Sequence, residues 1–525
     1  MIKSVWAITP QGRIECSAQV TAQQILWPEL WPHDILSIHI EWETAVAWVR
    51  SSAYTWEAAY AGWTAHMLSP KLIQLQNGQM VQASQTIGVW ELVHAHHLVW
   101  HIQGEMVQPM TRFNAQGIPE RHHLPPPPLM APLALWLPQQ AAELARSPHG
   151  FQAVVCFTDH CDFDTPEALQ VQLESLRAYN MTITKGFFYY NFAKRPNTVC
   201  LAEQPHWAAA FKKEGHEAAW HALSLSLQPP NEALAQCKSF VSAMDFTTYM
   251  DHGHQPYNWS QSHWTWSEKA VQYAQKGWRQ LWHYRDVGPA TRHWNQLDIR
   301  RWHLAHCLPW NTLFQMAHWA QALHFYRMHW ADPIAYEALG RLIHQIKSLH
   351  ARGTFSLMLG IGPTLWQHRK VFGCIKRAWT LRTRVPDAVR GQAIVYPIQL
   401  GPEVFWMFQT QLWNDWVTPL QPAALAAFVE AKGVCLAHTY LSVPLAHYPN
   451  RFMLTSTRIN PKVKPGLARL SQAIQQGQCW NPTLSEAMAY WQRFDQVTFT
   501  ITDAGVLQPN AMHLHWRSVA PCNVI

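Results

Sequence analysis

Short stretches near the start of the chain alternate apolar and polar residues. The clearest are residues 87–94 and 98–102, and a turn sequence with Asn-Gly at its centre precedes them at residues 76–79. A period of two is the pattern of a β-strand with one buried face, and Asn-Gly favours a tight hairpin turn. We therefore expect an antiparallel β-rich domain over residues 1–124.

Four consecutive prolines at residues 125–128 end this pattern. Proline lacks the backbone N–H, so a run of prolines forms neither a helix nor an inner strand. We expect a stiff proline-rich linker over residues 125–149.

From residue 150 the pattern changes to short apolar strands that alternate with amphipathic helices. Residues 152–157 form the first expected strand. Thr165 then supplies a helix N-cap, and Pro166 supplies a proline at the first helical position. The helix should end near Tyr179. Such alternation is typical of α/β domains.

The remaining segments complete the expected organisation. The α/β pattern extends over residues 150–505, and Trp, His and Leu recur at helical spacing over residues 265–350, which predicts a helical insertion there. Residues 506–525 are expected to be a C-terminal tail. No internal repeat is found.

Composition narrows the class of protein. Hydrophobic residues make up 48% of the chain and charged residues 14%, which is typical of a globular protein. The formal charge is +7 without a run of like charges, so nucleic acid is not an expected partner. Ten cysteines without C-x-x-C spacing favour reduced thiols. We find no signal peptide and no transmembrane segment, and expect a cytoplasmic protein. The oligomeric state is left open.

Three acids follow the first expected strand of the α/β region. Asp159, Asp162 and Asp164 lie within six residues. Barrel-type α/β enzymes place reactive groups at the carboxyl ends of their strands, so these acids are candidates for chemistry. The alternative is that they only cap the next helix.

A second candidate segment is Gly-His-Glu-Ala-Ala-Trp-His at residues 215–221. His216 and His221 are five residues apart, about 140° around a helix, so they do not form the zinc protease motif H-E-x-x-H.

Together the two segments resemble the polysaccharide deacetylases of the NodB-homology type, which implies a distorted (β/α)7-type barrel. The resemblance implies that Asp159 is the general base, and that Asp162 and His221 are metal ligands. The family's second metal histidine would fall at Leu225, and His252 is a possible replacement after another expected strand. His438 resembles the late histidine that protonates the leaving group.

The resemblance also implies a function. A divalent metal ion, with zinc favoured, would polarise an acetamide carbonyl of a carbohydrate substrate, and the products would be an amino sugar and acetate. Two alternatives stay open: a non-catalytic descendant that binds a glycan or a partner protein, motivated by Leu225, and a related glycoside hydrolase that uses carboxylates.

Histidines also gather in the β-rich region. His94, His96, His97 and His101 could bind a metal from a strand, because alternate residues share a face. An exposed, solvated face is the favoured interpretation.

Overall fold

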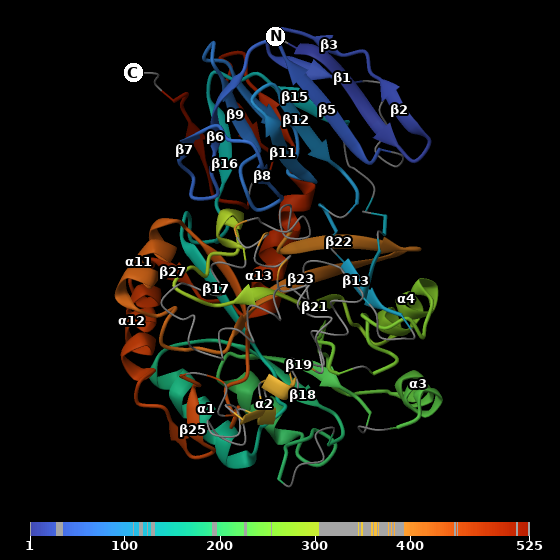
Figure 1. The fold of residues 1–525 in the computed structure, drawn as a ribbon, viewed down its shortest axis with the longest axis vertical. Helices are drawn as coiled ribbons and strands as arrows, with labels where there is room; N and C mark the ends of the chain where they lie inside the picture. Colours follow the sequence, from blue (N-terminus) through green and yellow to red (C-terminus); the bar gives the residue numbers. More distant parts are fainter. Residues whose placement is uncertain are drawn as a thin grey trace.

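A computed structural model gives the fold of the chain (Figure 1). It describes residues 2–303 and 393–522, except for 28–34, 105, 109, 115–118, 123, 126, 128–131, 192–196, 225–227, 254, 446–447, 449 and 511–512, and scattered residues from 345 to 383. The N-terminal sheets, drawn in blue, lie at one end of the molecule, and a barrel formed by later residues lies beside them.

Two antiparallel sheets form the N-terminal part. The first has the order β2 (Gly12–Glu15), β1 (Ile2–Thr9), β5 (Ser37–Trp42), β12 (His97–His101), β11 (Val89–His94), β8 (Trp63–Ala65). The second has the order β3 (Gln19–Val20), β4 (Gln24–Leu26), β15 (Ala134–Trp136), β10 (Met80–Ala83), β9 (Leu72–Leu75), β6 (Val46–Arg50), β7 (Trp56–Ala58). Buried residues of both sheets, such as Ile38 and Val81, share one core. The antiparallel β structure expected here is therefore present.

The expected linker contains strands. β15 lies inside the second sheet between β4 and β10, and β16 (Ala141–Leu144) pairs with β30 (Trp516–Val519) near the C-terminus. Leu133, Leu135 and Leu137 are buried in the core that the two sheets share, because alternate residues after the prolines turn inward. The expectation of a plain linker and a separate tail is therefore wrong, since both segments add to the N-terminal β structure.

Seven parallel strands close into a barrel. Their order is β18 (Thr184–Phe188), β19 (Glu217–Ala222), β20 (Thr248–Tyr249), β21 (Gln280–Pro289), β23 (Glu403–Trp413), β24 (Val434–Thr439) and β17 (Ala153–Asp159), and β17 pairs again with β18. The neighbouring strand pairs are all parallel. The expected barrel is thus confirmed at the level of a closed parallel barrel in a mixed α/β protein.

Helices follow most of the barrel strands along the chain. Those that the structure describes are α1 (Pro166–Ala178), α2 (His206–Lys213), α3 (Pro230–Ser239), α4 (Trp266–Gln275), α11 (Pro422–Glu430), α12 (Lys464–Gln475) and α13 (Leu484–Trp491). The cap and end expected for the first helix are confirmed, because α1 has Thr165 as its N-cap and Tyr179 as its C-cap.

The barrel strands bury both faces, which explains their apolar sequences. In β17, Val155 and Phe157 pack in the core that also contains helix residues, whereas Val154 and Cys156 belong to a second core inside the barrel. This second core also contains residues of α13, and Leu68 from the segment between β8 and β9. The inward or outward direction of each side chain therefore follows a period of two along the strand.

The expected helical insertion is only partly correct. Residues 266–275 form α4, but residues 280–289 form the barrel strand β21, whose Leu281 and Trp282 face the outer and inner cores respectively. The apolar run there reads equally as helix or strand, and pairing with β20 and β23 decides between them. Most of the remaining insertion lies outside the described residues. Among the helices that the structure describes, none is long and apolar enough to cross a lipid bilayer.

Candidate functional site

Three histidines from two barrel strands and one strand end meet inside the barrel. His160 directly follows β17, His221 lies near the end of β19, and His438 lies near the end of β24. The ring centroid of His160 lies 4.3 Å from that of His221 and 3.9 Å from that of His438. All three are at most 4% exposed. The carboxyl end of the barrel therefore holds a buried cluster of imidazoles.

Asp162 joins this cluster from the loop after β17. Its Oδ2 lies 3.1 Å from Nε2 of His221, and its Oδ1 lies 3.3 Å from Nδ1 of His252. The two histidine nitrogens are 2.9 Å apart. The structure thus brings together Asp162, His221 and His252, the three residues named from the sequence as metal ligands.

The nitrogen and oxygen atoms of this trio could hold a metal ion. Ligand atoms at about 2.0–2.1 Å from a tetrahedral zinc ion are roughly 3.3 Å from one another. His221 Nδ1 donates to the carbonyl oxygen of Met250 at 3.0 Å, so its Nε2 presents a lone pair to Asp162 and His252. Burial would raise the pKa of the Asp162 carboxyl, but His252 and His221 together lower it below its ordinary value. Asp162 is therefore ionised, as a ligand must be.

His160 is a further candidate ligand that was not expected from the sequence. His160, Asp162 and His221 form a group whose ligand atoms lie within 4.8 Å of one another. Among the described residues, no atom forms a hydrogen bond with either ring nitrogen of His160, and the side chain is 2% exposed. Burial lowers the pKa of His160 well below its ordinary value, so the imidazole stays neutral. Its place inside the acid cluster, between Asp159 and Asp162, is the sequence signal that could have identified it.

His438 is paired with a carboxylate. Its Nδ1 lies 3.1 Å from both oxygens of Asp286 on β21, and Asp286 in turn accepts a hydrogen bond from Thr410 at 2.7 Å. Trp282 meets the ring of His438 edge-on at 4.9 Å. Within the part of the chain that the structure describes, the buried Nε2 atom of His438 has no hydrogen-bond partner. An imidazole with one nitrogen held by a carboxylate and the other free is suited to proton transfer.

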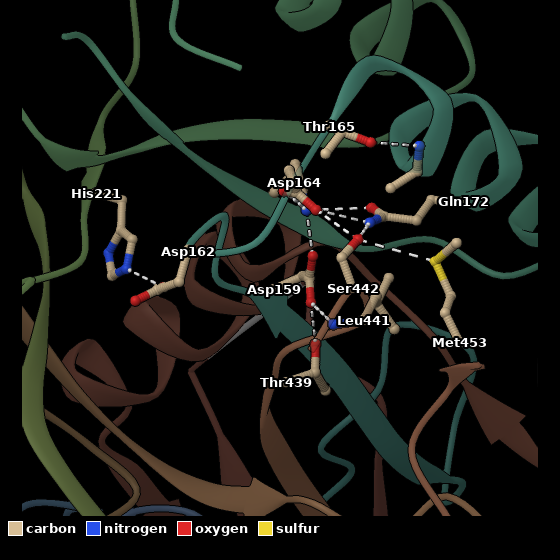
Figure 2. Close-up of polar contacts among 12 residues, drawn as sticks. Asp159, Asp162, Asp164, Thr165, Gln172, His221, Thr439, Leu441, Ser442 and Met453 are labelled. Atoms are coloured by element: carbon tan, nitrogen blue, oxygen red, sulfur yellow. Dashed lines mark hydrogen bonds and ion pairs between the residues drawn. The ribbon is translucent and has the colours of Figure 1, made fainter. Parts of the chain in front are cut away.

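Asp159 lies apart from the candidate metal ligands. Its Oδ1 accepts hydrogen bonds from Thr439 Oγ1 and Leu441 N, both at 2.8 Å, and its Oδ2 is ion-paired with Lys185. Figure 2 shows Asp162 turned towards His221, whereas Asp159 turns towards Thr439 and Leu441. The structure therefore does not bring the residue expected to be the base to the ligand trio.

Lys185 is the centre of a buried charge group that sequence reasoning missed. It is ion-paired with both Asp159 and Asp164 and donates to Gln172 at 3.1 Å. Asp164 also accepts hydrogen bonds from Gln172 and Ser442 (Figure 2). Burial, together with the second carboxylate, raises the pKa of Asp159 to about 6, although Lys185 opposes this shift. A lysine inside a buried strand sequence was the available signal.

The other motif residues have structural places. His216 packs against the Phe211 ring at 5.5 Å, at the opposite end of β19 from His221. Glu217 accepts hydrogen bonds from Thr184, Thr248 and Ser485. Leu225 lies outside the described residues.

Aromatic rings line the imidazole cluster. Phe188 is parallel to His221 with centroids 5.3 Å apart, and Tyr440 lies 4.8 Å from His438. These rings pack against the imidazoles and restrict their movement. No family model, curated protein or solved structure matches this chain.

Proposed function

We propose that the chain is a metal-dependent hydrolase that removes N-acetyl groups from a carbohydrate, in a (β/α)7-type barrel related to the NodB-homology deacetylases. One observation carries the proposal: an Asp-His-His set with metal-ligand spacing lies beside a histidine that is oriented by a carboxylate. Its position at the carboxyl ends of parallel strands, where barrel enzymes hold their active sites, supports it further.

Asp162, His221 and His252 would hold the metal ion, with His160 close enough to serve as a further ligand. Two or three imidazoles and one carboxylate favour zinc among the divalent metals. When bound, such an ion acts as a Lewis acid that polarises the acetamide carbonyl. Because Nδ1 of His221 donates to the Met250 carbonyl, the lone pair of its Nε2 is directed towards Asp162 and His252, where the ion would bind.

We assign the proton transfers to His438. Asp286 fixes the proton on Nδ1 and leaves Nε2 to act, in the manner of other carboxylate-oriented histidines. Nε2 would take a proton from the attacking water and return it to the departing amine. The water oxygen would form the new bond to the carbonyl carbon before the C–N bond breaks. The products would be the free amino sugar and acetic acid, whose remaining proton passes to solvent to leave acetate.

We assign a positioning role to Asp159. Its oxygens are occupied by Lys185, Thr439 and Leu441, and it lies on the outward-facing alternation of β17 with Val155 and Phe157. Asp159 is the last residue before the loop that carries Asp162. Its bonds to Thr439 and Leu441 tie the start of this loop to the end of β24 and the segment after it.

The test combines metal analysis with acetate release. Full-length protein is stripped with a chelator, reloaded with zinc, cobalt or nickel, and supplied with a panel of N-acetylated glycans. We expect His221→Gln to lose one metal equivalent and acetate release together, and Asp286→Asn to keep the metal but lose acetate release by about 100-fold. The exposed His206 on α2 provides a matched control, because His206→Gln should change neither quantity. Retention of that equivalent in His221→Gln, or absence of acetate release with every metal and glycan, would refute the proposal.

A further inference from the structure

The outer face of the first N-terminal sheet carries a histidine cluster that the barrel site does not use. His39 on β5 and His97 on β12 lie on this face, and Trp6 of β1 is opposite His39 in the strand register. The rings of Trp6, His39 and His97 are all 5.1–5.4 Å apart between centroids. All three side chains are partly exposed, so the cluster is accessible from solvent.

Two nitrogens of this cluster face each other. Nδ1 of His39 lies 3.1 Å from Nε2 of His97. Two nitrogens bound to one metal at about 2.0–2.1 Å are roughly 2.9 Å apart at a right angle and roughly 3.3 Å apart at the tetrahedral angle. The observed separation falls between these values. The spacing therefore suits two ligands of one ion.

We propose that His39 Nδ1 and His97 Nε2, completed by His94 and water, form a second metal site that takes a divalent transition metal ion of the zinc, copper and nickel class. His94 is paired with His97 across the β11–β12 hairpin, and their ring centroids are 5.4 Å apart. Because His94 is exposed, its ring can rotate towards the ion without disturbing the core. Imidazole is the ligand type that these metals share.

The second nitrogen of His39 is already engaged. Its Nε2 lies 3.1 Å from Ser37 Oγ, and a hydrogen bond donated there leaves the Nδ1 lone pair pointing at His97. Such a bond on the outer nitrogen is the usual arrangement for a metal-binding histidine.

Protonation agrees with this arrangement. Burial, then the neighbouring His97, His101 and Arg13, lowers the pKa of His39 to about 4. Burial and His94 also lower the pKa of His97. Burial thus disfavours the protonated form of both imidazoles.

The experiment separates this site from the barrel. In a His221→Gln and Asp162→Asn background, zinc is titrated into the chelator-treated full chain by calorimetry, and copper binding is followed by electron paramagnetic resonance. We expect the background protein to bind one equivalent of zinc, and the spectrum of bound copper to show couplings to nitrogen. His39→Gln and His97→Gln should each weaken binding by at least about tenfold. His101→Gln is the matched control, because His101 shares this face but is bonded to Glu91 at 2.9 Å.

Two outcomes would overturn the site: a background protein that binds no metal, or unchanged binding in both His39→Gln and His97→Gln with melting curves like the parent's. The first would show that the 3.1 Å contact is an ordinary N–H···N hydrogen bond. Failure of the barrel proposal gives a different result, because the unmodified chain would then bind one equivalent that His97→Gln removes and His221→Gln does not.

Discussion

The buried charge group around Lys185 determines the charge state of the carboxyl groups within it. One buried ammonium faces two buried carboxylates, Asp159 and Asp164, so the group carries an excess negative charge when all three are ionised. Desolvation makes such a charge costly unless it is paired. The pKa of Asp159 is raised because burial makes its ionised form costly.

Replacement of Lys185 by Met should therefore be far more harmful than replacement of one carboxylate. Lys185→Met leaves two buried carboxylates without a cation and should lower the free energy of unfolding by about 4 kcal/mol. Asp159→Asn keeps the Lys185–Asp164 pair and should cost about 1–2 kcal/mol. Urea unfolding at pH 7.5 measures both values, and Lys212→Met, which breaks the exposed Lys212–Asp245 pair, should cost less than about 1 kcal/mol.

The same variants examine the role of Asp159. If Asp159 is a positioning residue, activity and stability should decline together in Asp159→Asn. An Asp159→Asn protein with parental stability and no acetate release would instead identify Asp159 as the base.

At the scale of the elements, helix α1 connects the sequence to the site most directly. Thr165 Oγ1 accepts a hydrogen bond from Ala168 N at 3.3 Å and starts the helix immediately after Asp164 (Figure 2). Thr165→Ala should lower the free energy of unfolding by about 1 kcal/mol, because an N-terminal N–H loses its acceptor. Thr165→Ser keeps the oxygen and should be close to neutral in the same denaturation series. Equal losses in both variants would show that packing of the Thr165 methyl group, rather than the cap, is what matters.

The elements also show which features could be predicted from the sequence. The bounds of α1 follow from local signals at Thr165 and Tyr179, and so they were found. The alternation of side-chain direction along β17 also follows from the sequence. A period of two places Asp159 on the same outward side as Val155 and Phe157, and His160 on the inward side. The family resemblance directed attention to Asp159, whereas the period of two points to His160.

At the scale of the whole molecule, the partners that complete the site are distant in sequence. Asp286 reaches His438 across 152 positions, and Lys185 reaches Asp159 across 26. No local pattern contains these pairs, because closure of the barrel creates them. For the same reason the C-terminal strand β30, expected to be a tail, pairs with β16.

Several buried groups make stability depend on pH in opposing directions. Burial lowers the pKa of His66 to about 3 and that of His216 to about 4, whereas it raises the pKa of Asp159 and of Asp495 to about 6. The unfolded chain binds more protons at the histidines below pH 6.5, so their contribution to stability is lost as pH falls. The two carboxyl groups act the other way, since the folded chain holds their protons more tightly. These two histidines and these two carboxyl groups therefore act on stability in opposite directions.

His66 can be isolated from this sum. Its Nδ1 accepts a hydrogen bond from Leu68 N at 3.3 Å, and the side chain is 5% exposed. Between pH 7 and pH 4 its depressed pKa should remove about 3 kcal/mol of stability, at 1.36 kcal/mol for each unit below 6.5. In His66→Gln the amide oxygen can accept the same hydrogen bond without titrating, so this variant should lose about 3 kcal/mol less than the parent over the same range. Guanidinium unfolding of both proteins at pH 7, 5.5 and 4 gives the difference directly. Parallel pH dependences would show that the His66 imidazole becomes protonated inside the folded protein at little cost, and that water reaches it.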